Sequence, residues 1–278
     1  MLDLEAITAR LYPRFGKGAH RWVPKLLDRV SDLAAEWDLT VGAEFRSGNS
    51  SVVLRCRHRG GEAILKLSPD SYAVREETEM LLQFAPSGRV PAVLAADRGA
   101  VLLEAVDPGA LVEKLPAPPT PAEYAAFLID LHSAGDPASA PRKLADWLEV
   151  LFSSATKRGA DLTGSRGLRD ELLAQPTDEV LLHGDLHLGN VLTSDTKGLV
   201  AIDPMACVGD ASFDAVDYVL EGLDREEMVR RRDALAAAAD IDVDRLDAWC
   251  RVTAPIGATQ VSNARHSAEL GAFGRGEY

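Results

Sequence analysis

The sequence predicts an α+β protein of two lobes, a five-stranded antiparallel lobe followed by a mainly helical one. Between residues 39 and 106, short apolar runs alternate with turn signals such as Gly60-Gly61 and Asp97-Arg98-Gly99, as in antiparallel strands. Beyond residue 107, apolar residues recur at helical spacing over several long segments. A chain of 278 residues is long enough for two lobes that share a cleft.

Helices are expected first along the chain. Two runs in the first forty residues have apolar side chains at helical spacing, and we expect both to be packing helices. The runs contain Leu4, Ile7 and Leu11, and then Trp22, Leu26, Val30, Leu33 and Trp37.

Strand patterns follow, interrupted by one helix. We expect a helix over residues 72–85, after the third strand. The predicted strands cover residues 40–45, 51–57, 63–67, 90–95 and 100–106.

The boundary between the lobes is placed after Val106, which gives domains of residues 1–106 and 107–278. Residues 107–109 read Asp-Pro-Gly and should break the last strand. Thr120 and Glu123 then form a Thr-x-x-Glu capping box that starts a helix. Further helices are expected over residues 141–157, 167–174, 213–222, 225–239 and 243–253.

The most informative motif is His-Gly-Asp-Leu-His-Leu-Gly-Asn, at residues 183–190. Asp185 and Asn190 have the Asp-x-x-x-x-Asn interval of a kinase catalytic loop, in which the carboxylate orients a hydroxyl and the amide oxygen binds Mg²⁺. Residues 191–193 and 199–202 read as short strands around a turn at 195–198. This hairpin would return Asp203, a second metal ligand, to Asn190.

These residues resemble the aminoglycoside phosphotransferase family, in its streptomycin 6-kinase and hydroxyurea phosphotransferase branch. The match continues through Val208-Gly209-Asp210 and Phe213-Asp214, and covers roughly residues 21–249. The resemblance implies a bilobal protein-kinase-like fold and transfer of a phosphoryl group from ATP, with Mg²⁺, to a hydroxyl of a small molecule. A streptomycin-like aminoglycoside is the leading acceptor, and antibiotic resistance would follow.

Two other functions remain open from the sequence. The acceptor could be neutral, such as hydroxyurea or another metabolite, because acceptor specificity changes on a constant fold. The chain could also be a nucleotide-binding pseudokinase or regulatory module without turnover. A protein kinase is disfavoured, because no Ala-Pro-Glu segment follows Asp203.

The first residue assigned to nucleotide binding is Lys66, on the third strand. Its side chain should reach the α- and β-phosphates. The alternative is an ordinary strand lysine that faces solvent. Its partner should be Glu77, which shares a helical stripe with Val74 and Leu81, and the family's Glu-x-x-x-Leu pattern also falls there. Glu79 is the second choice.

Two further segments complete the expected nucleotide site. The small residues Gly48, Asn49 and Ser50 would let backbone N–H groups approach phosphates, although the same loop can be a plain hairpin connection. By resemblance, the backbone of Glu104, Ala105 and Val106 would bind adenine.

The acceptor site is centred on Asp185, which should orient the hydroxyl and take its proton late. His183 is expected to be buried and to brace the loop, whereas His187 could contact substrate or pack against the loop. Asp210 and Asp214 could hold the acceptor, and helix capping is the alternative for Asp210.

The charge of the chain is unevenly distributed. Residues 1–106 hold 14 acidic and 14 basic side chains, while residues 107–278 hold 29 and 16. An acidic lobe disfavours nucleic acid and attracts a cationic small molecule, although it can also serve only for solubility.

The location and assembly of the protein are predicted from what the sequence lacks. No leader or membrane-spanning run is seen, and Cys56, Cys207 and Cys250 fit no metal-binding pattern. We therefore expect a cytoplasmic monomer or weak dimer with no membrane partner.

Overall fold

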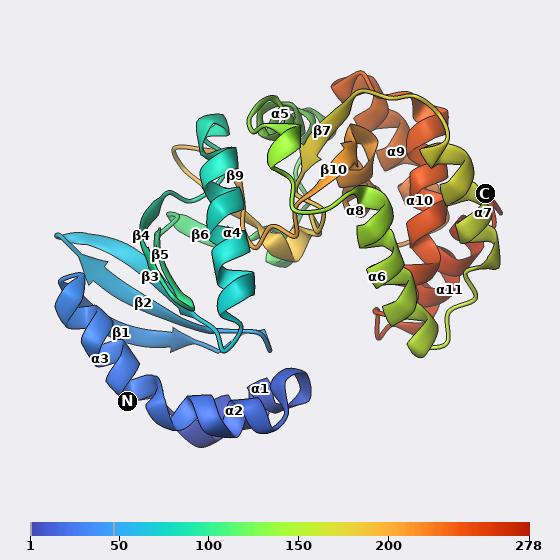
Figure 1. Cartoon of the computed structure of the whole chain (residues 1–278). Coiled ribbons are helices and arrows are strands. Elements are labelled where there is room, and N and C mark those ends of the chain that lie inside the picture. The colour runs from blue at the N-terminus through green and yellow to red at the C-terminus, as the bar shows by residue number, and fades with distance from the viewer. Residues whose placement is uncertain (1, 47) are drawn as a thin grey trace. The chain divides into compact units, whose positions relative to one another are not determined.

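The fold was analysed in a computed structural model, which describes residues 2–46 and 48–278 (Figure 1). The chain forms two compact units. The first unit comprises Met1–Leu82 and Pro91–Asp107, and the second comprises Gln83–Val90 and Pro108–Tyr278. The segment from Gln83 to Val90 thus packs with the second unit, although it precedes the last two strands of the first.

The first unit contains an antiparallel sheet with the strand order β1-β2-β3-β5-β4. Helix α4 (Ser71–Phe84) follows the third strand, so five antiparallel strands with a helix after the third are confirmed. The fourth strand begins three residues later than expected, since Pro91 has no N–H to donate to a ladder. The strands are β1 (Leu39–Phe45), β2 (Val52–His58), β3 (Gly61–Leu67), β4 (Val93–Asp97) and β5 (Ala100–Glu104).

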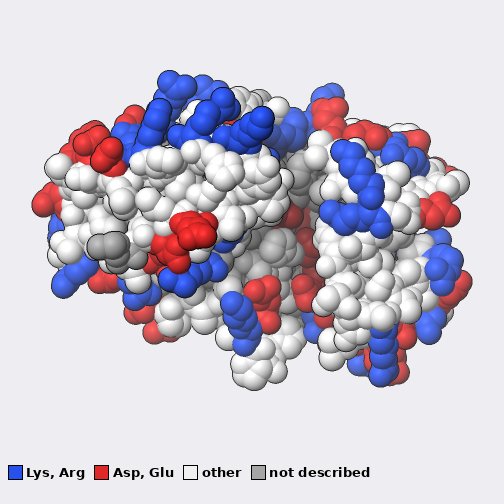
Figure 2. Space-filling model, turned by 90° about the horizontal axis from the view of Figure 1, so that it is seen from below, with Lys and Arg blue, Asp and Glu red and all other residues white. Residues whose placement is uncertain are grey.

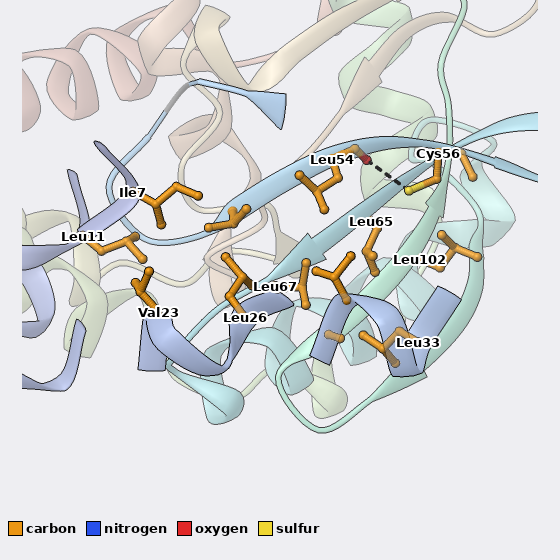
Figure 3. Packing of buried hydrophobic residues seen from close by; sticks show 14 of the residues in the cluster. Ile7, Leu11, Val23, Leu26, Leu33, Leu54, Cys56, Leu65, Leu67 and Leu102 are labelled. Atoms are coloured by element: carbon orange, nitrogen blue, oxygen red, sulfur yellow. Dashed lines mark hydrogen bonds between the residues drawn. The ribbon is translucent and has the colours of Figure 1, made fainter. Parts of the chain in front are cut away.

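Three N-terminal helices contribute buried residues to the core on one face of this sheet, and Figure 3 shows the labelled side chains of the first and third packed against strand residues. The helices are α1 (Leu4–Phe15), α2 (Lys17–Trp22) and α3 (Leu26–Glu36). Ile7, Leu11 and Leu33 on the helices are buried in one cluster with Leu65 and Leu67 of β3. Because side chains alternate along a strand, Lys66 must point to the opposite face, where α4 lies.

The second unit is mainly helical, as predicted, with two small sheets. Its three-stranded sheet has the order β6-β8-β9, and β7 pairs with β10. The helices are α5 (Pro121–Ser133), α6 (Leu144–Lys157), α7 (Thr163–Leu173), α8 (Val216–Leu220), α9 (Arg225–Ala239), α10 (Val243–Gly257) and α11 (Ala264–Gly274). The strands are β6 (Pro108–Leu111), β7 (Glu179–Leu182), β8 (Val191–Ser194), β9 (Gly198–Ala201) and β10 (Cys207–Asp210).

Local signals predicted some elements of this unit better than others. The capping box at Thr120 and Glu123 is present and starts α5. The helix expected over residues 213–222 is shorter, because a 3₁₀ turn (Ala211–Ala215) precedes α8. Strand β10 was not predicted, since its partner β7 lies about 30 residues earlier in the sequence.

Two further observations concern the whole chain. Cys56, Cys207 and Cys250 are buried free thiols. Within residues 2–46 and 48–278, no helix combines the length and the apolar character that crossing a bilayer requires.

Candidate active site

The hairpin that was predicted after Asn190 is present in the second unit. Strands β8 and β9 pair from Val191 opposite Ala201 to Ser194 opposite Gly198. The Ile202 N–H donates to the Asn190 carbonyl at 2.9 Å and extends the ladder by one step. Asn190 and Asp203 therefore lie at the open end of the same hairpin. Asp203 has φ of 59°, a left-handed conformation that costs about 1–3 kcal/mol and is concentrated at functional sites.

The Asn190 side chain has one defined orientation. Its Nδ2 donates to the Asp185 carbonyl at 2.9 Å and lies 3.3 Å from Asp185 Oδ2. Because a carbonyl can only accept, the amide nitrogen must face the loop and Oδ1 must face away from it. An amide oxygen and a carboxylate are the hard oxygen ligands that Mg²⁺ prefers, so Asn190 and Asp203 fit this ion. Phosphate oxygens and water would supply the remaining positions.

Neighbouring helices hold the backbone on both sides of Asp185. Trp147 Nε1 donates to the Gly184 carbonyl at 2.7 Å, and the Tyr124 hydroxyl donates to the Leu186 carbonyl at 3.2 Å. The Asp185 side chain itself is 40% exposed, so a ligand can reach its carboxylate. The loop thus combines a fixed backbone with an accessible acid.

Asp214 braces this loop from inside the unit. Its carboxylate accepts the N–H groups of His183 at 2.7 Å and Gly184 at 2.9 Å, and it pairs with His132 Nε2 at 2.9 Å. Burial alone would raise the pKa of Asp214, but the contact with His132, the interaction with the His183 ring and the Gly184 N–H lower it below the usual value. The expectation that Asp214 contacts the acceptor is therefore corrected. Its side chain is only 2% exposed, and both carboxylate oxygens accept hydrogen bonds from groups inside the unit.

His183 is fully buried and braces the loop, as predicted. Its Nε2 donates to the Ile202 carbonyl at 3.0 Å, which links the loop to the end of the hairpin. Burial lowers the pKa of His183 despite the nearby carboxylates, so the ring is neutral and holds its proton on Nε2. A proton-transfer role is not supported by this geometry.

Asp210 is also internal and does not face Asp185. Its carboxylate accepts Trp249 Nε1 at 2.5 Å and the Ser212 N–H at 3.0 Å, and it forms an ion pair with Arg245. The side chain therefore caps the 3₁₀ turn, which is the alternative that the sequence left open. The expectation that Asp210 holds the acceptor is corrected for the same reason as for Asp214.

A cavity of about 360 Å³ opens beside Asp185 within the second unit. Asp185 and His187 line one side of it, and Asp217 and Glu221 of the α8 region line another. The remaining wall comes from α10, α11 and the segment between them, including Gln260. His187 thus borders the cavity, as one of its two predicted roles requires, and its Nε2 lies 3.9 Å from Asp185 Oδ2.

Asp217 is a site residue that sequence reasoning missed. Burial, and next the charge of Asp185, raise its pKa to about 7. Among the described residues, no side-chain or backbone group donates a hydrogen bond to its carboxylate, although it is mostly buried. Its position four residues before Glu221, on one helical face, is the only sequence signal that pointed to it.

The lysine expected to bind phosphates is found in the first unit. Lys66 Nζ contacts both carboxylate oxygens of Glu77, at 2.8 and 2.7 Å. Glu79 is exposed and lies 3.8 Å from Arg75, so Glu77 is the partner and the second choice is not used. The choice that helical periodicity made between the two glutamates is therefore correct.

The other predicted nucleotide contacts are also in the first unit. Gly48 has φ of 71°, which favours glycine, in the connection between β1 and β2. At the end of β5, the Glu104 N–H donates to the Ala92 carbonyl at 2.8 Å, so it is not available to adenine. Ala105 and Val106 lie beyond the end of β5, so their N–H groups take no part in the strand ladder.

Known proteins resemble this chain over most of its length. A family model described as aminoglycoside/hydroxyurea antibiotic resistance kinase matches residues 36–265. A hydroxyurea phosphotransferase from Kitasatospora aureofaciens is 32% identical over 268 residues, which cover 90% of this chain and 77% of that protein. A streptomycin 6-kinase from Streptomyces glaucescens is 30% identical over 285 residues, with coverage of 88% and 86%.

The fold has counterparts among solved structures. A mutant of the aminoglycoside phosphotransferase APH(4)-Ia, solved as a ternary complex with ADP and hygromycin B, superposes with a TM-score of 0.62. The superposition covers 88% of this chain and 97% of the other at 15% identity, which shows the protein-kinase-like fold alone. With the family match over residues 36–265, the chain belongs to the aminoglycoside/hydroxyurea antibiotic resistance kinases.

Proposed function

We propose that this kinase transfers the γ-phosphoryl group of ATP, with Mg²⁺, to a hydroxyl of a small cationic molecule of the aminoglycoside type. Modification of such an antibiotic would confer resistance. The proposal depends mainly on one cavity. The accessible carboxylate of Asp185 lines it together with two further carboxylates, Asp217 and Glu221.

Asp185 would act mainly by positioning. Phosphoryl transfer passes through a loose transition state, so the acid must align the acceptor hydroxyl first and accept its proton late. The bonds from Trp147 and Tyr124 to the adjoining carbonyls hold the backbone of the loop during this step. His187 borders the same space and would contact the acceptor.

Roles in nucleotide binding are proposed separately for residues of each unit. Asn190 and Asp203 would hold Mg²⁺, which supplies charge neutralisation on the phosphates when it is bound. Lys66, oriented by Glu77, would contact the α- and β-phosphates, and the backbone of residues 48–50 would cover them. Ala105 and Val106 would offer backbone groups to adenine.

A cationic acceptor is favoured by the charges around the cavity. Within residues 2–46 and 48–278, no group donates a hydrogen bond to the Asp217 carboxylate, and a buried carboxylate of this kind is stabilised by a cation or a hydrogen-bond donor from a ligand. The acidic excess lies in residues 107–278, yet Figure 2 shows both signs of charge on the face in view. The local carboxylates therefore support the proposal more strongly than the net charge does.

A neutral acceptor such as hydroxyurea is the second candidate. The similarity to a hydroxyurea phosphotransferase favours it, as does a cavity of about 360 Å³, near the lower end for ligand sites. A pseudokinase without turnover is a third candidate, but the sequence retains Lys66, Asp185 and Asn190, which turnover would require.

The test is to measure phosphorylated product by mass spectrometry with ATP, Mg²⁺ and either streptomycin, another aminoglycoside or hydroxyurea, at two ionic strengths. Phosphorylation of a cationic acceptor, with kcat/KM that falls steeply as salt is added, supports the proposal. A salt-insensitive preference for hydroxyurea contradicts the cationic acceptor and leaves the kinase activity intact. No product and no nucleotide consumption with any acceptor would favour the pseudokinase.

A further inference from the structure

Arg10, on the first helix, reaches the connection between β1 and β2 in the first unit. One nitrogen, Nη1, donates to the carbonyls of Gly48 at 2.8 Å and Ser51 at 2.9 Å. The other, Nη2, contacts Glu44 Oε1 at 2.5 Å. Arg10 is 19% exposed and Glu44 is 7% exposed, so this contact is shielded from water and is worth more than a surface ion pair.

The same connection is held from a second side. Ser68 Oγ, just beyond β3, donates to the Ser50 carbonyl at 2.6 Å. Three carbonyls of residues 48–51 are thus occupied by donors from outside the loop. Within the part of the chain that the structure describes, the N–H groups of Gly48, Asn49 and Ser50 have no protein acceptor.

In the connection at residues 48–51, three carbonyl groups are occupied and three N–H groups are available, which favours binding of an anion. Consecutive N–H groups without protein acceptors leave positive partial charges available to an anion, and carbonyl oxygens turned toward a phosphate would repel it. The guanidinium of Arg10 prevents that by holding the Gly48 and Ser51 oxygens. Its planar fork can bind two carbonyls and a carboxylate together, which a lysine ammonium cannot reproduce with the same geometry.

We propose that Arg10 is a positioning residue of the nucleotide site, which holds residues 48–51 in the arrangement that covers the phosphates. The inference rests on the proposed use of ATP. Arg10 lies outside residues 36–265, so the N-terminal helix contributes to phosphate binding from beyond the family match as well as packing under the sheet. The adenine contacts at Ala105 and Val106 involve no atom of Arg10.

The experiment compares Arg10→Met and Arg10→Lys with a matched control, Arg29→Met. Arg29 also joins an N-terminal helix to a turn of the sheet, through Asp97 at 2.6 Å, but it touches no residue of the connection at 48–51. The dissociation constants of ATP with Mg²⁺ and of adenosine are measured by calorimetric titration. Melting temperatures are recorded for every variant.

Arg10→Met should raise the dissociation constant of ATP about tenfold, since a charge-assisted brace is lost, and leave that of adenosine unchanged. Arg10→Lys should fall between Arg10→Met and the unaltered protein, and Arg29→Met should bind both ligands normally. Lysine retains the charge and most of the stem, so this variant tests the inference even if Arg10→Met does not fold.

Two results would overturn the inference. Normal ATP affinity in both Arg10 variants, with or without a lower melting temperature, would reduce Arg10 to a packing role. Equal losses for ATP and adenosine would indicate general distortion of the unit. If the unaltered protein bound no ATP at all, the proposed function would fail first, which the control titration of that protein shows directly.

Discussion

Lys66 and Glu77 form a buried ion pair in which one ammonium contacts both carboxylate oxygens. Their side chains are 10% and 11% exposed, so water compensates neither charge fully. Removing one partner leaves the other charge poorly solvated, and that penalty exceeds what the pair itself contributes to stability. The pair thus fixes the lysine side chain in position on the α4 face of the sheet.

A double-mutant cycle with Lys66→Met and Glu77→Gln should give strongly non-additive losses of ATP affinity. Either single change disrupts the same ion pair, so the second change should add little to the loss. The coupling free energy between the two changes should be about 1–3 kcal/mol. Glu79→Gln is the control, because Glu79 lies on the same helix but is exposed and pairs with Arg75. Additive losses, or an equal effect of Glu79→Gln, would show that the pair does not act as one unit.

The pair could be predicted because both of its ends follow local rules. Strand alternation places Lys66 on the other face of the sheet from Leu65 and Leu67. Helical periodicity places Glu77 on the stripe of α4 that faces inward. The hairpin that returns Asp203 to Asn190 was predictable for the same reason, since turn residues and short strands are neighbours in sequence.

The acceptor side could not be predicted in this way. Its cavity forms where the α8 region meets α10 and α11, and nothing local in the sequence fixes how those helices pack. Asp210 and Asp214 were considered as acceptor contacts because the family resemblance extends over their segment. A buried loop instead needs acceptors for its own N–H groups, and Asp214 meets that need at His183 and Gly184.

Asp185→Ala should lower kcat by about a thousandfold, because it removes the group that orients and deprotonates the hydroxyl. The dissociation constant of ATP should stay within about twofold, since we assign no nucleotide contact to Asp185. Rapid-quench product formation and ATP titration measure the two quantities. Turnover near the original rate would exclude Asp185 as the acid that positions the acceptor.

Asp203→Ala and Asn190→Ala should weaken Mg²⁺-dependent ATP binding and turnover together, because both remove oxygens assigned to the ion. The Mg²⁺ concentration that gives half-maximal activity should rise at least about tenfold. Thr193→Ala serves as a control, because Thr193 lies in the same hairpin without a metal role. An unchanged Mg²⁺ requirement in both variants would contradict the assignment.

Asp214→Asn should destabilise the protein by about 3 kcal/mol, because an amide cannot replace a buried carboxylate that two N–H groups and His132 share. It should also lower kcat in the fraction that stays folded, since the loop at Asp185 loses its brace. Asp210→Asn should lower stability as well, but with nearly normal kcat and KM. Thermal unfolding and kinetics at a permissive temperature distinguish the two variants. A raised KM for the acceptor in Asp210→Asn would indicate that Asp210 contacts the acceptor after all.

Asp217 should make the binding of a cationic acceptor depend on pH near neutrality. Its pKa of about 7 lies above the usual value, so the carboxyl is protonated below that pH and negative above it. The charged groups that act on it are Asp185, His187, Glu221 and Asp214, and the three carboxylates oppose its ionisation. The KM for a cationic acceptor should therefore rise as pH falls from 8 to 6, and a bound cation should lower the apparent pKa.

The matched variants for this prediction are Asp217→Asn and Asp195→Asn. Asparagine at 217 cannot ionise, so KM should be high at every pH and the dependence near pH 7 should flatten. Asp195 lies in the exposed hairpin turn outside the cavity, so its variant removes the same charge from the second unit and should keep the original profile. Because kcat depends mainly on Asp185, it should change less than KM when position 217 is altered. A flat KM profile in the unaltered protein, or an equal shift in both variants, would mean that net charge rather than Asp217 attracts the acceptor.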